Sequence, residues 1–81
     1  MPDKFKRVQV VWHDAFSTDA WTDIDGLDKN PLEVTSIGYL VAKTKDTVVV
    51  AGTIGQGQAC CVIHIPRGMV KSMAVLPKGG R

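Results

Sequence analysis

Short runs of alternating apolar and polar side chains dominate the pattern along this chain. Val8, Val10 and Trp12 alternate with mainly polar neighbours, a two-residue period typical of a half-buried strand, so Trp12 is expected in the core. From residue 34 onwards the pattern favours β-structure throughout. Four further strands, separated by polar or glycine-rich turns, are expected at residues 34–43, 47–54, 59–65 and 69–76. Strands at this spacing predict an antiparallel sandwich or barrel.

The number of strands and the chain length narrow this prediction. Five short strands within 81 residues are too few for two complete sheets, and a chain of this length accommodates one domain. We therefore predict a single all-β domain over residues 1–81, folded as a small, strongly bent antiparallel β-barrel, because closing a sheet removes most of its exposed edges. Residues 77–81 are expected to form a flexible tail.

Residues 13–33 interrupt the strand pattern as an acidic insertion between the first and second strands. Trp21, Ile24 and Leu27 are three residues apart within it, a spacing that places them on one side of a short helix around residues 18–27. A packed loop explains the same residues. Trp21 is expected to plug one mouth of the barrel; the alternative is that it stays exposed for stacking on a partner.

Composition indicates an ordinary small globular protein. Hydrophobic residues make up 44% of the chain and charged residues 22%, which argues against a fully disordered chain. The longest apolar runs, at residues 48–51 and 59–63, are far shorter than the ~20 residues of a membrane-spanning helix. The polar start has no apolar stretch typical of a signal peptide. We therefore expect a cytoplasmic protein without a membrane-bound segment.

Charge is distributed unevenly along the chain. The formal net charge is +2, with −2 over residues 1–30 and +4 over residues 31–81. The total is too weak to indicate nucleic-acid binding by itself. The acidic segment is either a solvated loop beside an ordinary surface, or one of two complementary surfaces on neighbouring subunits, with the basic half available to an anionic ligand.

Groups that could carry catalysis form no recognisable pattern. Cys60 and His64 are four residues apart on one expected strand, about 13 Å at ~3.3 Å per residue, too far for a nucleophile pair or a shared metal. His13 beside Asp14 can orient an imidazole, but a histidine at a strand end is more often structural. Without a triad or the spacing of a zinc site, we expect no enzyme activity, no metal and no cofactor.

The two cysteines, Cys60 and Cys61, are adjacent in an apolar strand. Neighbours on a strand point to opposite faces, and free cysteines in such a strand behave as small hydrophobic residues. The spaced C-x-x-C pair typical of redox sites is missing. The sequence therefore favours a structural role for both.

Two other stretches imitate known motifs. Residues 23–28 resemble part of a calcium loop, but its first and last ligand positions fall on Trp21 and Leu32, which cannot ligate calcium. An acidic surface turn is expected instead. The three glycines within residues 52–57 imitate a phosphate-binding fingerprint, which needs a following helix. Because a strand is expected to follow, we predict a turn between two strands.

Two segments resemble the motifs of the Sm-like family. Residues 38–50 resemble the first motif: a glycine, a leucine two positions on, an acidic turn and an apolar strand. Residues 65–73 resemble the second, in which a strand ends in Arg-Gly and a short strand follows. The resemblance implies an Sm-like, SH3-like β-barrel that forms rings and binds RNA near the first-motif turn and the Arg-Gly pair. The positions that correspond to this nucleic-acid- or anion-binding site are Lys45, Asp46, Arg67 and Gly68.

The pattern of the whole chain is also similar to small phage- and prophage-encoded proteins of unknown function. Its marks are Val11-Trp12-x-Asp14 followed by Trp21, then residues 36–41 and residues 65–68. This resemblance implies no activity. It implies phage origin and action in the cytoplasm of a bacterial host.

Two functions follow from these observations. The first is a non-enzymatic Sm-like barrel that binds RNA or a small anionic nucleotide through basic residues at its rim, consistent with the +4 charge of residues 31–81. The second is a structural or protein-interaction module of the phage accessory type with no nucleic-acid role. The weak net charge favours it, as does Thr47 near the position of the family's base-contacting Asn. Under either, open sheet edges and a small core favour a homo-oligomer, either a dimer or a ring.

Overall fold

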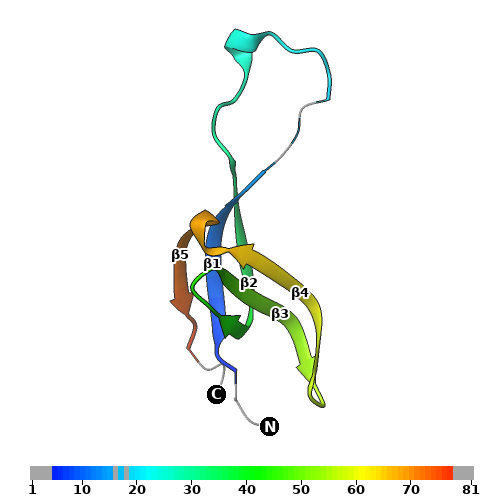
Figure 1. Cartoon of the computed structure of the whole chain (residues 1–81), viewed down its shortest axis with the longest axis vertical. Helices are drawn as coiled ribbons and strands as arrows, with labels where there is room; N and C mark the ends of the chain where they lie inside the picture. Colours follow the sequence, from blue (N-terminus) through cyan, green and yellow to red (C-terminus); the bar gives the residue numbers. More distant parts are fainter. Residues whose placement is uncertain (1–4, 16, 18, 78–81) are drawn as a thin grey trace.

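Five antiparallel strands in one sheet make up the computed structural model, which describes residues 5–15, 17 and 19–77 (Figure 1). The strands are β1 (Arg7–Asp14), β2 (Leu32–Lys43), β3 (Thr47–Gly55), β4 (Gln58–Pro66) and β5 (Val70–Val75). Their order across the sheet is β4-β3-β2-β1-β5. The prediction of an all-β chain with five strands is confirmed. The tail expected at residues 77–81 lies, beyond Pro77, outside the described residues.

The sheet is strongly curled. In a flat five-stranded sheet the edge strands β4 and β5 would lie four strand spacings, roughly 19 Å, apart. Yet β4 ends at Pro66 and β5 begins at Val70, and that length of chain covers at most about 14 Å when fully extended. Register shifts in β1 and β2 accompany the bend. Among the described residues β4 and β5 do not pair, so closure into a barrel is not confirmed.

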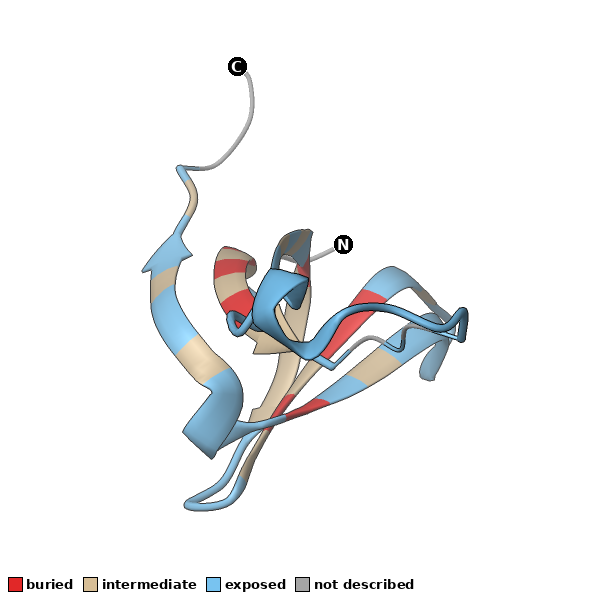
Figure 2. Cartoon of the chain, turned by 90° about the horizontal axis from the view of Figure 1, so that it is seen from above, coloured by how far each residue is buried: buried red, intermediate tan, exposed pale blue. Residues whose placement is uncertain are grey.

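The core lies on the concave side of this curl. The chain alternates inward and outward along β1, and the inward residues Val8 and Val10 are both 0% exposed. Trp12 continues the same row, and its indole Nε1 donates a hydrogen bond to Ser36 Oγ at 3.1 Å. The expectation that Trp12 belongs to the core is confirmed. The buried apolar residues come from β1, β3 and β4, and the segments that hold buried residues are red in Figure 2: Val8, Val10, Trp12, Val48, Val50, Ala51 and Ile65.

Gly38 allows β2 and β3 to approach each other closely where the sheet bends. A Cβ atom at this position would lie 2.5 Å from the carbonyl oxygen of Ala51 and 2.7 Å from Val50 Cγ1. Neither the backbone oxygen nor the buried valine has room to move. Only glycine therefore fits there.

The turn between β3 and β4 uses the backbone conformation that tight hairpins require. Gln56 and Gly57 occupy it with φ angles of 51° and 74°, and two positive φ values in succession match the right-handed twist of the flanking strands. The predicted turn within residues 52–57 is thus confirmed. The phosphate-binding geometry that these glycines imitate would need a helix here, and a strand stands in its place.

Between β1 and β2 the described residues 15, 17 and 19–31 belong to a long loop, which projects from one end of the molecule (Figure 1). The predicted helix over residues 18–27 is wrong: among the described residues of the loop the only helical segment is one 3₁₀ turn, η1 (Ile24–Gly26). Aspartate, threonine and glycine are poor helix formers, and a short helix needs a surface to pack against. The loop raises the radius of gyration to 16.0 Å, against about 12 Å for a compact chain of this length. Within the described residues no helix is long and apolar enough to cross a membrane.

Candidate functional site

The two segments predicted to bind nucleic acid meet within one chain. After β4, the 3₁₀ turn η2 (Arg67–Met69) lies against the turn that joins β2 to β3. The backbone amide of Arg67 donates to the carbonyl oxygen of Asp46 at 2.9 Å, and its guanidinium Nη1 donates to the carbonyl oxygen of Thr44, also at 2.9 Å. Register explains the meeting, because Thr47 at the start of β3 pairs with Pro66 at the end of β4.

The β2–β3 turn is itself held by a threonine. Thr44 Oγ1 accepts hydrogen bonds from the backbone amides of Asp46 at 3.2 Å and Thr47 at 3.0 Å, which is how hydroxyl side chains stabilise tight turns. One donor of the Arg67 guanidinium is thus used to hold a well-formed turn. The others face solvent, because Arg67 is exposed.

Together these residues form an exposed, mildly basic rim. We call the group Lys45, Asp46, Arg67 and Met69 the Arg67 rim; Gly68 lies between the last two. All are exposed, and their formal charge is +1. Within the described part of the chain the Lys45 side chain makes no hydrogen bond or ion pair, so its ammonium group is available to a ligand.

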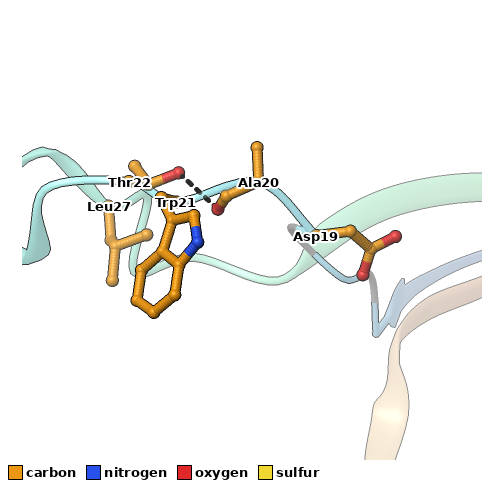
Figure 3. Close-up of a pocket in the computed structure, with 5 residues that line it drawn as sticks. All are labelled: Asp19, Ala20, Trp21, Thr22 and Leu27. Atoms are coloured by element: carbon orange, nitrogen blue, oxygen red, sulfur yellow. Dashed lines mark hydrogen bonds between the residues drawn. The ribbon is translucent and has the colours of Figure 1, made fainter.

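A second exposed cluster lies in the β1–β2 loop, about Trp21. Trp21 is 103% exposed and Ile24 is 79% exposed, so the expectation that Trp21 plugs the mouth of a barrel is wrong. Figure 3 shows the Trp21 indole beside Leu27 in a depression also lined by Asp19, Ala20 and Thr22. The only hydrogen bond drawn there is local, from Thr22 Oγ1 to the carbonyl oxygen of Ala20 at 3.1 Å.

The apolar side chains of this loop stand among carboxylates. Residues 15–31 hold four aspartates and one lysine, a net charge of −3. We use the name Trp21 tip for the three apolar residues and the four aspartates of this loop: Trp21, Ile24, Leu27, Asp19, Asp23, Asp25 and Asp28. The tip combines a large aromatic anchor with a negatively charged surround.

The side chains of Cys60 and Cys61 do not point to opposite faces of the strand, as the sequence led us to expect. Both side chains are exposed, and their sulfur atoms lie 3.7 Å apart on the same side of β4, not on opposite faces of an apolar strand. The reason is the backbone of Cys61, whose φ of 58° interrupts the strand alternation. The hydrogen bond with Cys60, followed by charge repulsion from Cys60 and some desolvation, raises the pKa of the Cys61 thiol.

The remaining candidate groups do not converge. Asp14 Oδ1 accepts a hydrogen bond from the backbone amide of Ala15 at 2.8 Å, and no hydrogen bond links it to His13 within the described residues. No group of three or more histidine, cysteine, aspartate or glutamate side chains is placed to hold a metal ion in the described ranges. The features left for function are therefore the Arg67 rim, the Trp21 tip and the paired thiols.

Comparison of the chain with protein-family models, with curated proteins and with solved structures finds no match in any of the three. The function must therefore be argued from the residues themselves.

The sequence singled out Lys45, Asp46, Arg67 and Gly68, which the structure places side by side, but it did not predict how the other two clusters are exposed. Trp21, Ile24 and Leu27 have the three-residue spacing of a helix face. This spacing does not indicate whether another part of the protein covers that face. The adjacent cysteines were visible in the sequence, but the positive φ of Cys61 occurs at a gap in the pairing of β4 with β3, opposite Gly52. One sequence signal was available: Gly52, which lies across from Cys61, marks a place where a strand departs from regular geometry.

Proposed function

We propose that this protein is a self-assembling protein-interaction module, in which the Trp21 tip of one copy docks on the Arg67 rim of the next. The observation that carries this proposal is the full exposure of Trp21, at 103%, in a loop that stands away from the sheet. Clustered apolar side chains at such a position mark interaction sites. Exposed tryptophans in particular tend to become the anchors of protein interfaces.

Burial of the tip would supply a substantial driving force. A tryptophan buries ~150–250 Å² when covered, equivalent to about 4–6 kcal/mol of hydrophobic free energy. Part of this is offset by the ordering of the loop and by the loss of translational freedom. Ile24 and Leu27 add apolar area beside the indole.

Charge and chemistry make a second copy the favoured partner. The loop has a net charge of −3 and residues 31–81 have a net charge of +4. The free donors of the Arg67 guanidinium suit the aspartates of the tip, while the guanidinium and the Met69 thioether suit the face and edge of an indole. Because the tip and the rim are different surfaces, the contact is head to tail, and repetition generates a ring or a filament.

We also propose that the curled sheet is a small barrel of the Sm-like or SH3-like kind. The strand order β4-β3-β2-β1-β5 and the short η2 connection between the two edge strands support it. In this proposal the acidic loop is an insertion between the first two strands of that barrel.

The assembly is tested by light scattering over a range of concentrations reaching tens of micromolar. The parent is expected to form oligomers whose fraction rises with concentration, and Trp21→Ala to remain monomeric. Ile37→Ala is the matched control, because Ile37 is also an exposed apolar residue, at 62%, but lies on β2 away from the loop. A strictly monomeric parent, or a Trp21→Ala variant that assembles like the parent, contradicts the proposal.

A charge exchange tests the pairing of tip and rim. Asp25→Lys and Lys45→Glu are each expected to weaken assembly, and the double variant to recover part of it, because the two charges then attract again. If the double variant does not recover assembly, the Trp21 tip does not dock on the Arg67 rim. Assembly driven by the tip would then involve another surface.

The second candidate function is binding of RNA or a small anionic nucleotide at the Arg67 rim. The specific observation in its favour is the hydrogen-bonded contact of Arg67 with the Thr44–Asp46 turn, which brings Lys45, Arg67 and Gly68 to one exposed place. Lys45→Ala is the sharper variant, since Arg67→Ala also removes a structural hydrogen bond. Binding of single-stranded RNA that weakens steeply with salt and falls in Lys45→Ala would support it; no binding at low salt would exclude it.

A further inference from the structure

We propose that Cys60 and Cys61 form a two-thiolate chelating site for a soft, thiolate-preferring metal ion. Their sulfur atoms are 3.7 Å apart, and both side chains are exposed. Two thiolates on a tetrahedral ion with metal–sulfur bonds of ~2.3 Å lie about 3.8 Å from each other. The pair is therefore already spaced as two ligands of one such ion.

The backbone brings the sulfurs together. On a regular strand adjacent side chains point to opposite faces, and two cysteines could not then hold one ion. Cys61 has a φ of 58°, a conformation that is uncommon for a residue with a side chain and that marks sites of function when it occurs. It turns the Cys61 side chain to the side of Cys60.

The neighbouring strand accommodates this conformation. Gly52 of β3 lies across from Cys61, and a Cβ atom on Gly52 would be 3.2 Å from Cys61 Cβ. That distance is tighter than ordinary van der Waals contact. The missing side chain at Gly52 thus leaves room for the Cys61 backbone to depart from the strand.

The location of the pair leaves it open to an incoming ion. β4 is an edge strand, so its free side faces solvent, and both thiols can be reached without any rearrangement of the core. Within the described residues no third histidine, cysteine or carboxylate joins the pair. The ion therefore takes two ligands from each chain, and water or the thiolates of a second copy complete its coordination.

The chemistry of the ligands defines the class of ion. Thiolates favour Zn²⁺, Cd²⁺ and Cu⁺ over Mg²⁺ and Ca²⁺. Binding of a divalent ion replaces two S–H bonds by two metal–sulfur bonds and releases two protons to solvent. Neither sulfur changes oxidation state in this step.

Cd²⁺ is the probe for the test, because thiolate-to-metal charge transfer gives it an ultraviolet absorption band. The full chain, kept reduced with a phosphine, is titrated with Cd²⁺, as are Cys60→Ser and Cys61→Ser. Each single substitution is expected to weaken binding ~10²–10⁴-fold, because the second thiolate then no longer acts at high effective concentration. His64→Gln is the matched control, because His64 is an exposed residue on the same strand whose imidazole could in principle ligate a metal ion, and this variant is expected to bind Cd²⁺ like the parent.

Three results would overturn the proposal. They are a parent that binds Cd²⁺ no better than a simple monothiol, single serine variants that bind as tightly as the parent, and a band that depends on His64. Circular dichroism of each variant establishes that the sheet is intact. Trp21→Ala is expected to keep full Cd²⁺ binding, so the site is tested independently of the assembly proposed above.

Discussion

The sheet and the β1–β2 loop contain the same kinds of apolar residue, but the sheet buries its tryptophan and the loop exposes its own. In the sheet, Trp12 is 8% exposed, with its indole nitrogen bonded to Ser36. In the loop, Trp21 is 103% exposed, and its indole lies beside Leu27 of the same loop (Figure 3). An apolar residue is buried only if another element provides a facing surface, and β1 has paired strands on both sides. Among the described residues, no strand pairs with the loop.

The transition between the two regions is abrupt. Pairing of β1 with β2 continues as far as Asp14 opposite Leu32. Beyond it, local side-chain contacts replace sheet pairing: Asp14 accepts from the Ala15 amide, and Asp28 Oδ1 accepts from the Asn30 amide at 3.0 Å. These short-range bonds favour turns over strands, so the chain leaves the sheet at a defined place.

Exchanging each tryptophan for alanine gives the largest contrast between the regions. Trp12→Ala is expected to lower the free energy of unfolding by about 3–5 kcal/mol because it leaves a cavity in the core. Trp21→Ala is expected to change that of the monomer by less than ~0.5 kcal/mol. Urea unfolding of dilute protein measures both; Trp12→Phe, a smaller change, keeps the test usable if the alanine variant does not fold. Equal losses at the two positions would show that the loop is packed.

The next largest contrast in stability is expected between a glycine of the sheet and a glycine of the loop. Gly38→Ala is expected to destabilise the sheet by about 1–3 kcal/mol, because the new methyl group would overlap the Ala51 carbonyl oxygen. Gly26→Ala in the loop meets nothing within 4 Å and is expected to be neutral. Thermal unfolding distinguishes them. A tolerated alanine at position 38 would mean that β2 and β3 are not as close as described.

The two basic residues of the rim differ in role. Arg67 makes a hydrogen bond within the chain, whereas the charge of Lys45 is available to a ligand. Arg67→Ala removes the hydrogen bond to the Thr44 carbonyl oxygen and is expected to cost about 1 kcal/mol. Lys45→Ala removes no such bond and is expected to stay within ~0.5 kcal/mol of the parent. Denaturant unfolding of the two variants side by side is the measurement. An Arg67→Ala variant as stable as Lys45→Ala would show that the Arg67 guanidinium does not stabilise the turn in the parent. The whole guanidinium of the parent would then be free for a ligand.

The smallest effect is expected at the base of the loop. Lys71 Nζ of β5 and Glu33 Oε1 of β2 lie 3.5 Å apart, both exposed. A double-mutant cycle with alanine at each position is expected to give a coupling energy of about 0–1 kcal/mol, because solvent screens such pairs. A larger coupling would indicate that this ion pair orders the start of β2 and, with it, the exit of the loop.

Local sequence determined much of the sheet. The alternation through Val8, Val10 and Trp12 and the glycine at position 57 depend on a few neighbouring residues, so strands and turns were predictable to within one or two residues. The choice of Lys45, Asp46, Arg67 and Gly68 rested on the motif resemblance, and these residues lie together within one chain. What they bind stays a prediction.

What the tertiary structure alone decided are the features that depend on partners distant in sequence. Trp21 stays exposed because none of the described strands faces it. Cys61 adopts a positive φ across from Gly52, and the Arg67 guanidinium reaches a carbonyl oxygen 23 residues away. Hydrophobic periodicity reports which way a side chain points along its own element. It does not report whether another element arrives to cover it, and that is settled only when the whole sheet has curled.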